Sequence, residues 1–161
     1  PHIVRIYAEL AAGEQAQVCY ASSWACDLTA DTGRPQIEDA LFGQLMADMA
    51  EQRRRCTTLV GPHLDDLEFT IAQISARAFA SQGQQRSLVL AVKLAQVELV
   101  AEMSGQYPLF LLDDVMSELD ADRRSRLLGL VGAGVQTIVT TTNLDYFSHA
   151  ELDAAKVVRL P

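Results

Sequence analysis

Cysteine is scarce in this sequence of 161 residues, and the pattern of its three cysteines excludes two common kinds of small domain. Cys19, Cys26 and Cys56 are odd in number and include no C-x-x-C pair. Neither a disulfide framework nor a zinc site fits that count and spacing. A reducing cytosol is therefore the expected compartment.

Long apolar runs and clustered cations are missing as well. No apolar stretch approaches the roughly 18 residues that cross a membrane, and no signal-peptide pattern opens the chain, so no membrane partner is expected. The net charge is −8, and acids outnumber basic residues both in residues 1–80 and in residues 81–161. The one basic run, Arg53–Arg55, is typical of a solvated helix end. Strong sequence-independent binding of DNA needs clustered cations, so we do not expect it of this chain alone.

The composition that is present, 49% hydrophobic and 21% charged, is ordinary for a single globular domain. The pattern predicts an α/β fold. An apolar strand, a helix and a second apolar strand indicate a buried parallel βαβ unit with a right-handed crossover. Strands are expected over 2–9, 15–21, 108–112, 136–141 and 157–160, with two short ones around Gly61–Pro62. Helices are expected over 33–55 (amphipathic through Ile37, Leu41, Leu45 and Met49), 84–103 (apolar on most faces, capped by Ser81 and ended by Gly105) and 120–131.

The run LFLLDD ends in two adjacent acids, Asp113 and Asp114. The carboxyl edge of a parallel sheet is where open α/β sheets bind ligands. Asp113 could hold Mg²⁺, a cation that prefers oxygen ligands, and Asp114 could orient or deprotonate a water molecule. The alternative is that both aspartates only cap the strand end and the next helix.

The run SQGQQR, residues 81–86, places a glycine at the start of the long helix. Backbone N–H groups at such a helix start can approach a phosphate closely, and Ser81 and Gln82 can add side-chain donors. Ordinary helix capping is the alternative. SELD, residues 117–120, also fits a capping segment by itself. His63 and the pair Asp65–Asp66 are expected to be structural.

The order and spacing of these segments are more specific than any one of them. The S-x-G-Q-Q turn, the strand ending in two acids, S-x-L-D and a second apolar strand resemble an ABC-type ATPase head. In that resemblance they are the signature motif, the Walker B strand and the D-loop. The motifs GPHLDDLEF, FASQGQQRSLVLAVKLA, LLDDVMSELDADRR and TIVTTTNLDYF resemble more closely the RecF family of bacterial recombination mediators, over residues 57–147.

The resemblance implies a role for each matching residue. Asp113 would bind Mg²⁺ through water, and Asp114 would be the catalytic carboxylate. Ser117 and Asp120 would line a dimer interface, and Thr141 would contact the nucleotide. The residues of the signature motif would bind ATP that is held by a second subunit: Ser81, Gln82, Gly83, Gln84 and Gln85. Direct contacts with the γ-phosphate would come from Ser81, Gly83 and Gln84.

No G-x-x-x-x-G-K-[ST] loop occurs in the sequence, so the lysine that grips phosphate is missing. The resemblance therefore implies the C-terminal part of an ABC-type head without its P-loop half, and an inactive chain in isolation. Residues 1–60 would supply strands and a helical arm with the amphipathic helix, and residues 61–161 the motifs. The expected cofactors are ATP and Mg²⁺. The expected partners are DNA, RecR- and RecO-like proteins and a second copy of the intact protein.

Three other functions stay open. An SMC-like ATPase head fragment would share the motifs, although no coiled-coil heptads flank SQGQQ. A non-catalytic dimerisation or partner-docking module would explain the missing P-loop. A metal-dependent phosphoesterase built on Asp113 and Asp114 would need further ligands that the sequence does not place.

Overall fold

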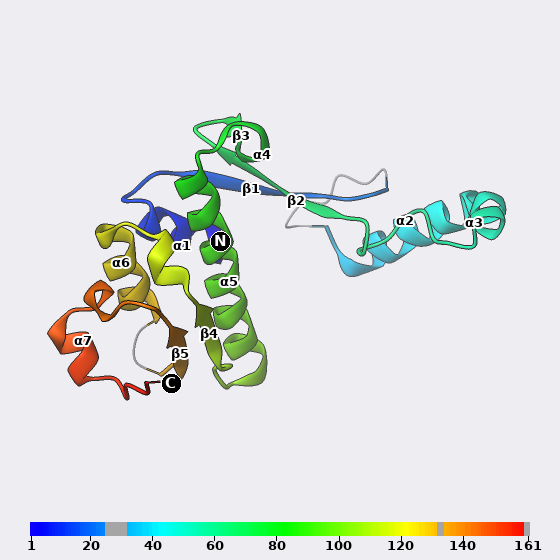
Figure 1. Ribbon diagram of the computed structural model, residues 1–161. Coiled ribbons are helices and arrows are strands. Elements are labelled where there is room, and N and C mark those ends of the chain that lie inside the picture. The colour runs from blue at the N-terminus through cyan, green and yellow to red at the C-terminus, as the bar shows by residue number, and fades with distance from the viewer. Residues whose placement is uncertain (25–31, 132–133, 160–161) are drawn as a thin grey trace. The chain divides into compact units, whose positions relative to one another are not determined.

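A computed structural model describes residues 1–24, 32–131 and 134–159 (Figure 1). Two compact units make up the chain: Pro1–Ala16 together with Ala80–Pro161, and Gln17–Phe79. Cys26 and Leu160, which carried two of the expectations above, lie outside the described residues. No helix of the described part is long and apolar enough to cross a membrane.

The first unit opens with a helix, α1 (His2–Leu10), so the predicted strand at residues 2–9 is wrong. The β-branched residues of HIVRIYAEL favour a strand locally. However, Ile6, Tyr7 and Leu10 also repeat at helical spacing, and all three are buried. α1 lies between α5 (Gln82–Ser104) and α6 (Ala121–Val131) and contacts both (Figure 1). Tertiary packing therefore decides the conformation here.

The predicted long helix is confirmed as α5. Its N-cap is Ser81, whose side chain accepts a hydrogen bond from the Gln84 backbone N–H, and it ends at Gly105 in the left-handed conformation, φ 71°. Leu88, Ala91 and Leu94 are among its buried residues. The opposite face is exposed although it is also apolar; its exposed side chains are Val89, Leu99, Val100 and Met103.

The predicted parallel βαβ unit is confirmed. β4 (Phe110–Asp113) and β5 (Thr137–Thr140) pair in parallel, with Asp113 opposite Thr140, and α6 lies between them in the sequence. The expectation that both strands are fully buried is wrong. Leu111 and its partner Ile138 are 63% and 49% exposed, because no described element covers that face of the pair.

Short helices follow the two strands. A 3-10 turn, η1 (Val115–Glu118), follows β4 directly, and η2 (Leu144–Tyr146) and α7 (His149–Asp153) follow β5. Residues 157–159 form no strand, contrary to prediction. Val157 and Val158 are exposed, which shows that two adjacent β-branched apolar residues are not sufficient to form a strand here.

The second unit holds a three-stranded sheet in the order β1 (Ala16–Ala21), β2 (Asp66–Ile71), β3 (Ile74–Ser75). β2 and β3 are antiparallel, joined by Ala72 and Gln73 in the left-handed conformation. α4 (Ala76–Phe79) follows β3. The strands at 15–21 and after Gly61–Pro62 are thus confirmed, whereas residues 57–60 form none.

The amphipathic helix predicted over 33–55 is two helices, α2 (Arg34–Ala47) and α3 (Met49–Arg55), which meet at Asp48. Neither helix has a fully buried residue. The predicted stripe of Ile37, Leu41, Leu45 and Met49 is half-buried. Arg53, Arg54 and Arg55 are exposed, as expected of a helix end.

Candidate functional site

The carboxyl ends of β4 and β5 bring Asp113, Asp114 and Thr140 together. The Thr140 hydroxyl donates a hydrogen bond to Asp113 Oδ1 and accepts one from the Asp114 backbone N–H at 3.0 Å. The Asp114 N–H also lies 3.2 Å from the Thr140 carbonyl oxygen. Thr140 thus contacts both aspartates, and it can do so because the parallel register sets it opposite Asp113.

Asp114 leaves the strand direction sharply. Its φ is 49°, a left-handed value that is uncommon outside glycine but tolerated by Asp. The turn starts η1, and the Ser117 hydroxyl lies 3.1 Å from Asp114 Oδ2 and 2.8 Å from the Asp114 carbonyl oxygen. The backbone reversal therefore separates the two adjacent side chains: Asp113 is held by β5, and Asp114 by η1.

The two carboxylates can hold part of a cation site. Both are exposed, and within the described residues neither forms an ion pair. Asp113 Oδ2 and Asp114 Oδ1 have no hydrogen-bond partner among those residues, so each carboxylate keeps one oxygen available. No group of three or more His, Cys, Asp or Glu suited to a metal occurs in the described part. Asp113 and Asp114 therefore fit one or two of the oxygen ligands of Mg²⁺, with the others coming from water or phosphate.

The signature turn, which we define as Ser81–Gln85, forms the amino end of α5. Ser81 and Gln84 cap each other: the Gln84 N–H lies 3.2 Å from Ser81 Oγ, and the Ser81 N–H lies 2.8 Å from Gln84 Oε1. The Gln85 side chain donates to the Ala80 carbonyl oxygen at 3.0 Å. Gln82 is exposed and has no polar contact with the described residues. The sequence prediction of a helix-start turn is confirmed in its geometry.

A residue outside the motif, Glu14, holds the signature turn. The Gln84 side-chain Nε2 donates to Glu14 Oε1 at 2.7 Å, and the buried Tyr7 hydroxyl donates to Glu14 Oε2 at 2.5 Å. Both polar atoms of the Gln84 side chain are thus hydrogen-bonded within the chain, and the phosphate contact that the resemblance implies for Gln84 stays a prediction. No motif marks Glu14 in the sequence; only the turn at Gly13 places it.

Arg123 links the signature turn to the D-loop. Its guanidinium packs so closely against Gly83 that an added Cβ would lie 3.0 Å from Nη1. The same Nη1 lies 2.7 Å from Asp120 Oδ2, and the Arg123 backbone N–H donates to Asp120 Oδ1 at 2.8 Å. This backbone hydrogen bond, with the nearby guanidinium, lowers the pKa of Asp120 below its usual value. Asp120 caps α6, as the sequence predicted.

Arg86 makes a second link from α5 to the D-loop. Its Nη1 donates to the Glu118 carbonyl oxygen at 2.9 Å, and its Nε lies 3.3 Å from Glu118 Oε2. Arg86 and Arg123 together hold Ser117–Asp120 beside the signature helix. Neither arginine was given a role from the sequence, because the contacts that join α5 to the D-loop region, Arg86 with Glu118 and Arg123 with Gly83, span 32 and 40 positions of the chain.

Thr141 lies one residue beyond the strand-end contacts. Its hydroxyl donates to the Asn143 carbonyl oxygen at 3.0 Å and accepts from the Asn143 N–H at 3.2 Å. The structure gives Thr141 a role in shaping the loop after β5. Thr140 is the residue of this TTT run that contacts the aspartates, because the register of the strand pair sets it opposite Asp113. Side chains alternate along a strand, but alternation alone does not say which threonine faces the aspartates.

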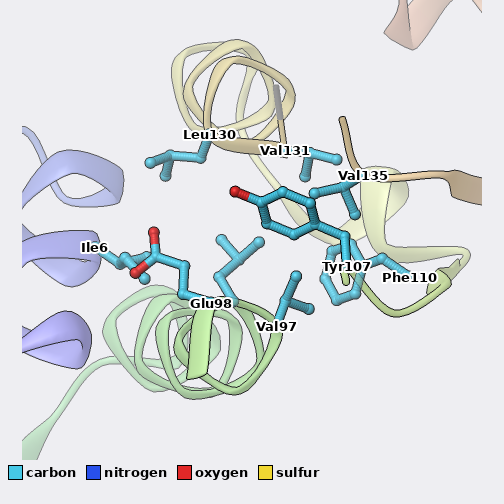
Figure 2. A pocket seen from close by; sticks show the side chains of 9 residues that line it. Ile6, Val97, Glu98, Tyr107, Phe110, Leu130, Val131 and Val135 are labelled. Atoms are coloured by element: carbon cyan, nitrogen blue, oxygen red, sulfur yellow. The ribbon is translucent and has the colours of Figure 1, made fainter. Parts of the chain in front are cut away.

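An apolar hollow of about 100 Å³ lies at the other end of β4, away from the aspartates. Phe110, the first residue of the strand, lines it together with Val97, Val131 and Val135. Figure 2 shows the Tyr107 ring among these side chains, with the Glu98 carboxylate at the side of α1. That carboxylate is paired with Arg5 and His2, so the described lining of the hollow offers no unpaired charge for a ligand.

The polar residues of GPHLDD belong to the second unit and hold its backbone. The Ser23 N–H donates to Asp65 Oδ1 at 2.6 Å, and the Tyr20 hydroxyl donates to Asp65 Oδ2. His63 Nε2 lies 2.9 Å from the Thr58 hydroxyl, and its ring packs against Gly61, whose φ is 138°. The structural roles expected for His63 and Asp65 agree with these contacts.

The parallel βαβ core, with two acids at the strand ends and the S-Q-G-Q-Q turn opening the long helix, is the α/β fold of an ABC-type ATPase head fragment. No family model matches the chain. Curated relatives do match it. The DNA replication and repair protein RecF of Gloeobacter violaceus is 48% identical over 124 residues, which cover 77% of this chain and 33% of that protein.

A second relative and two solved structures agree. RecF of Lactobacillus delbrueckii is 44% identical over 136 residues, 84% of this chain and 35% of that protein. The structure titled recombination mediator protein RecF-ATPrS in the RecFOR pathway has a TM-score of 0.67 and 31% identity over 89% of this chain and 38% of its own. The corresponding RecF-ATP structure has a TM-score of 0.67 and 29% identity. The chain belongs to the RecF family, and it spans about a third of the length of the curated relatives it matches.

Proposed function

We propose that this chain is part of a RecF-like recombination mediator in which ATP joins two heads and the closed dimer holds DNA. The observation that carries the proposal is the acid pair at the strand ends. Thr140 and Ser117 hold the two carboxylates, and one oxygen of each has no partner among the described residues. The relatives support the choice, since two similar solved structures are titled RecF-ATP and RecF-ATPrS. The chain is 161 residues long and covers only a third of such proteins, so the activity belongs to the intact protein.

The two acids would have different roles, one in binding the metal ion and the other in activating water. Asp113, oriented by Thr140, would hold Mg²⁺ through water. When bound there, Mg²⁺ supplies positive charge for the oxygens of the transferred phosphoryl group. Asp114, turned aside and oriented by Ser117, would position the attacking water and accept its proton. The left-handed turn at Asp114 makes this division possible, because it aims two adjacent side chains differently.

The signature turn would meet the γ-phosphate of ATP held by a second subunit. The first N–H groups of a helix have no partner inside the helix and carry partial positive charge, which favours an anion. Ser81 retains a hydroxyl hydrogen for such a ligand, and the exposed Gln82 side chain can reach it. Gln84 would act by shaping the turn, because both ends of its amide are already bonded.

DNA binding and partner recognition would also belong to the intact protein. The chain carries a net charge of −8, so the cations that grip DNA phosphates must come mainly from the rest of the dimer. RecR- and RecO-like proteins are the expected partners, with loading of a recombinase at gapped DNA as the outcome. The exposed side chains of Leu111 and Ile138 support the proposal that the chain is part of a longer protein, because an exposed apolar face of a strand pair is usually buried by another part of the protein.

The test measures ATP turnover by the intact protein with Mg²⁺, with and without gapped DNA, beside the 161-residue chain. Turnover by the intact protein, loss of turnover with EDTA and a silent chain are the expected results. If the 161-residue chain hydrolyses ATP alone, the assignment of the P-loop to the rest of the protein is wrong. If the intact protein binds no ATP and hydrolyses none, the docking-module alternative replaces the ATPase proposal.

A further inference from the structure

Glu14 joins the signature turn to the buried core, although it belongs to none of the sequence motifs. One carboxylate oxygen accepts from Gln84 at 2.7 Å, and the other accepts from Tyr7 at 2.5 Å. Tyr7 is 0% exposed and lies on α1. Burial, followed by the bond to Glu14, raises the pKa of the Tyr7 hydroxyl, so this hydroxyl remains a proton donor.

The backbone between α1 and β1 is built to bring Glu14 back toward α5. Ala12 and Gly13 are consecutive left-handed residues, with φ 58° and 89°. The Gly13 N–H donates to the Ala8 carbonyl oxygen at 2.7 Å, and the Glu14 N–H donates to the Ala11 carbonyl oxygen at 3.2 Å. The reversal is therefore hydrogen-bonded within itself, and Glu14 is half-buried beside a packed helix.

The chemistry of a carboxylate explains what this contact does to Gln84. An ionised carboxylate only accepts hydrogen bonds, so the atom that Gln84 turns toward Glu14 must be its NH₂ group. The amide oxygen is then aimed at the Ser81 N–H, 2.8 Å away, and closes the cap. With the opposite amide orientation, both contacts would be lost. Glu14 thus selects the one rotamer of Gln84 that fixes the amino end of α5.

We propose that Glu14, anchored by Tyr7, is a positioning residue that holds the signature turn in its phosphate-presenting form. The inference rests on the proposed function, in which this turn engages ATP bound by a second subunit. Glu14 touches neither the nucleotide nor the metal. It acts through Gln84, and its effect is on the joining of two heads, while binding of ATP by a single head does not depend on it.

The experiment measures two quantities on the intact protein: ATP affinity of the monomer and ATP-dependent dimerisation by sedimentation. Glu14→Ala is expected to weaken dimerisation about tenfold, the size of losing a charged hydrogen bond, while ATP affinity stays within about twofold. Glu14→Gln retains an acceptor for Gln84 and is expected to restore most of the dimer. Glu9→Ala, an exposed glutamate on α1 paired only with Arg5 among the described residues, is the matched control.

A double-mutant cycle separates positioning from general support of the fold. In a Gln84→Ala background, Glu14→Ala should cause no further loss of dimerisation, because the group it positions is gone. A loss of the same size in both backgrounds would overturn the inference. If Glu14→Ala does not fold, Tyr7→Phe keeps the buried ring and removes only the hydroxyl anchor; it should weaken dimerisation several-fold, and an unchanged dimer overturns the inference. A wild-type protein that never dimerises with ATP would instead defeat the proposed function.

Discussion

The strand-end cluster and the signature turn use polar groups in opposite ways. In the cluster, defined as Asp113, Asp114, Ser117 and Thr140, the neutral hydroxyls hold the carboxylates and leave acidic oxygens available. In the signature turn the side chains of Gln84 and Gln85 are bonded within the chain, so among the described residues the available groups are mainly the backbone N–H groups of the helix start, with the Gln82 side chain beside them. The cluster can therefore act through side-chain chemistry, and the turn through backbone shape.

This difference determines which substitutions should matter in each region. Replacing the carboxylate of an acid in the cluster by an amide of the same shape should remove its ability to bind a cation or accept a proton, and should leave the fold intact. A change at the turn should act through geometry, by moving N–H groups or by filling space beside Gly83.

Asp114→Asn in the intact protein should lower the rate of ATP hydrolysis by about 100-fold or more, because an amide cannot accept the proton of the attacking water. The amide can still accept the Ser117 hydrogen bond, so folding and ATP affinity should stay close to wild type. Single-turnover hydrolysis and equilibrium nucleotide binding measure the two effects. Asp122→Asn, an exposed acid in the first turn of α6, is the control. Normal hydrolysis by Asp114→Asn would remove Asp114 from the mechanism.

Thr140→Val should reduce hydrolysis by about tenfold, because it removes the hydroxyl that orients Asp113 and caps the Asp114 N–H. Valine has nearly the shape of threonine and favours strands, so the sheet should be retained. Thr141→Val is the matched comparison in the adjacent residue, whose hydroxyl only bonds Asn143 within the described residues. A larger defect in Thr141→Val than in Thr140→Val would support the sequence-based assignment of Thr141 to the nucleotide.

The sequence predicted the elements whose local signals agree with their packing. The S-Q-G-Q-Q turn, the capped α5, the end at Gly105 and the parallel pair β4–β5 all follow from caps, periodicity and apolar runs. The prediction of a strand at residues 2–9 was wrong, because it gave more weight to the β-branched residues than to the helical spacing of Ile6, Tyr7 and Leu10. Only the packing of α1 against α5 and α6 resolves that conflict.

The residues that hold the site were harder to predict than the residues of the site. Glu14 reaches Gln84 across 70 positions, and Arg123 reaches Gly83 across 40 positions, and no sequence pattern marks either contact. Two acids after an apolar run predicted the strand end itself. That Thr140 rather than Thr141 contacts them depends on the register of β5 opposite Asp113. Register is a property of the assembled sheet.

Gly83→Ala should weaken ATP-dependent dimerisation by about fivefold, with little change in stability. The new Cβ would lie 3.0 Å from Arg123 Nη1, and the end of a long side chain can move aside. Moving Arg123 should disturb the Asp120 contact and crowd the approach of a phosphate to the backbone. Gly129→Ala is the control, since nothing lies within 4 Å of its added Cβ. There alanine should stabilise α6 by up to about 1 kcal/mol. Equal dimerisation by Gly83→Ala and wild type would argue against backbone recognition.

Asp120→Asn should have the smallest effect, visible as a change in the pH dependence of unfolding. Asparagine can still cap α6, so the variant removes mainly the charge that pairs with Arg123. The folded-state pKa of Asp120 lies below the unfolded value of 3.8, so its charge stabilises the fold above about pH 3.8. As the pH falls further through the lowered folded-state pKa, this contribution disappears.

Denaturant unfolding between pH 6 and pH 3 should therefore show wild type slightly more stable than Asp120→Asn at the upper end, by less than about 1 kcal/mol for so exposed a pair. The two curves should converge at the acidic end. A constant gap across the whole range would mean that the aspartate acts only through the cap geometry. In that case Arg123 is held at Gly83 by packing, and the link between the D-loop and the signature turn does not depend on charge.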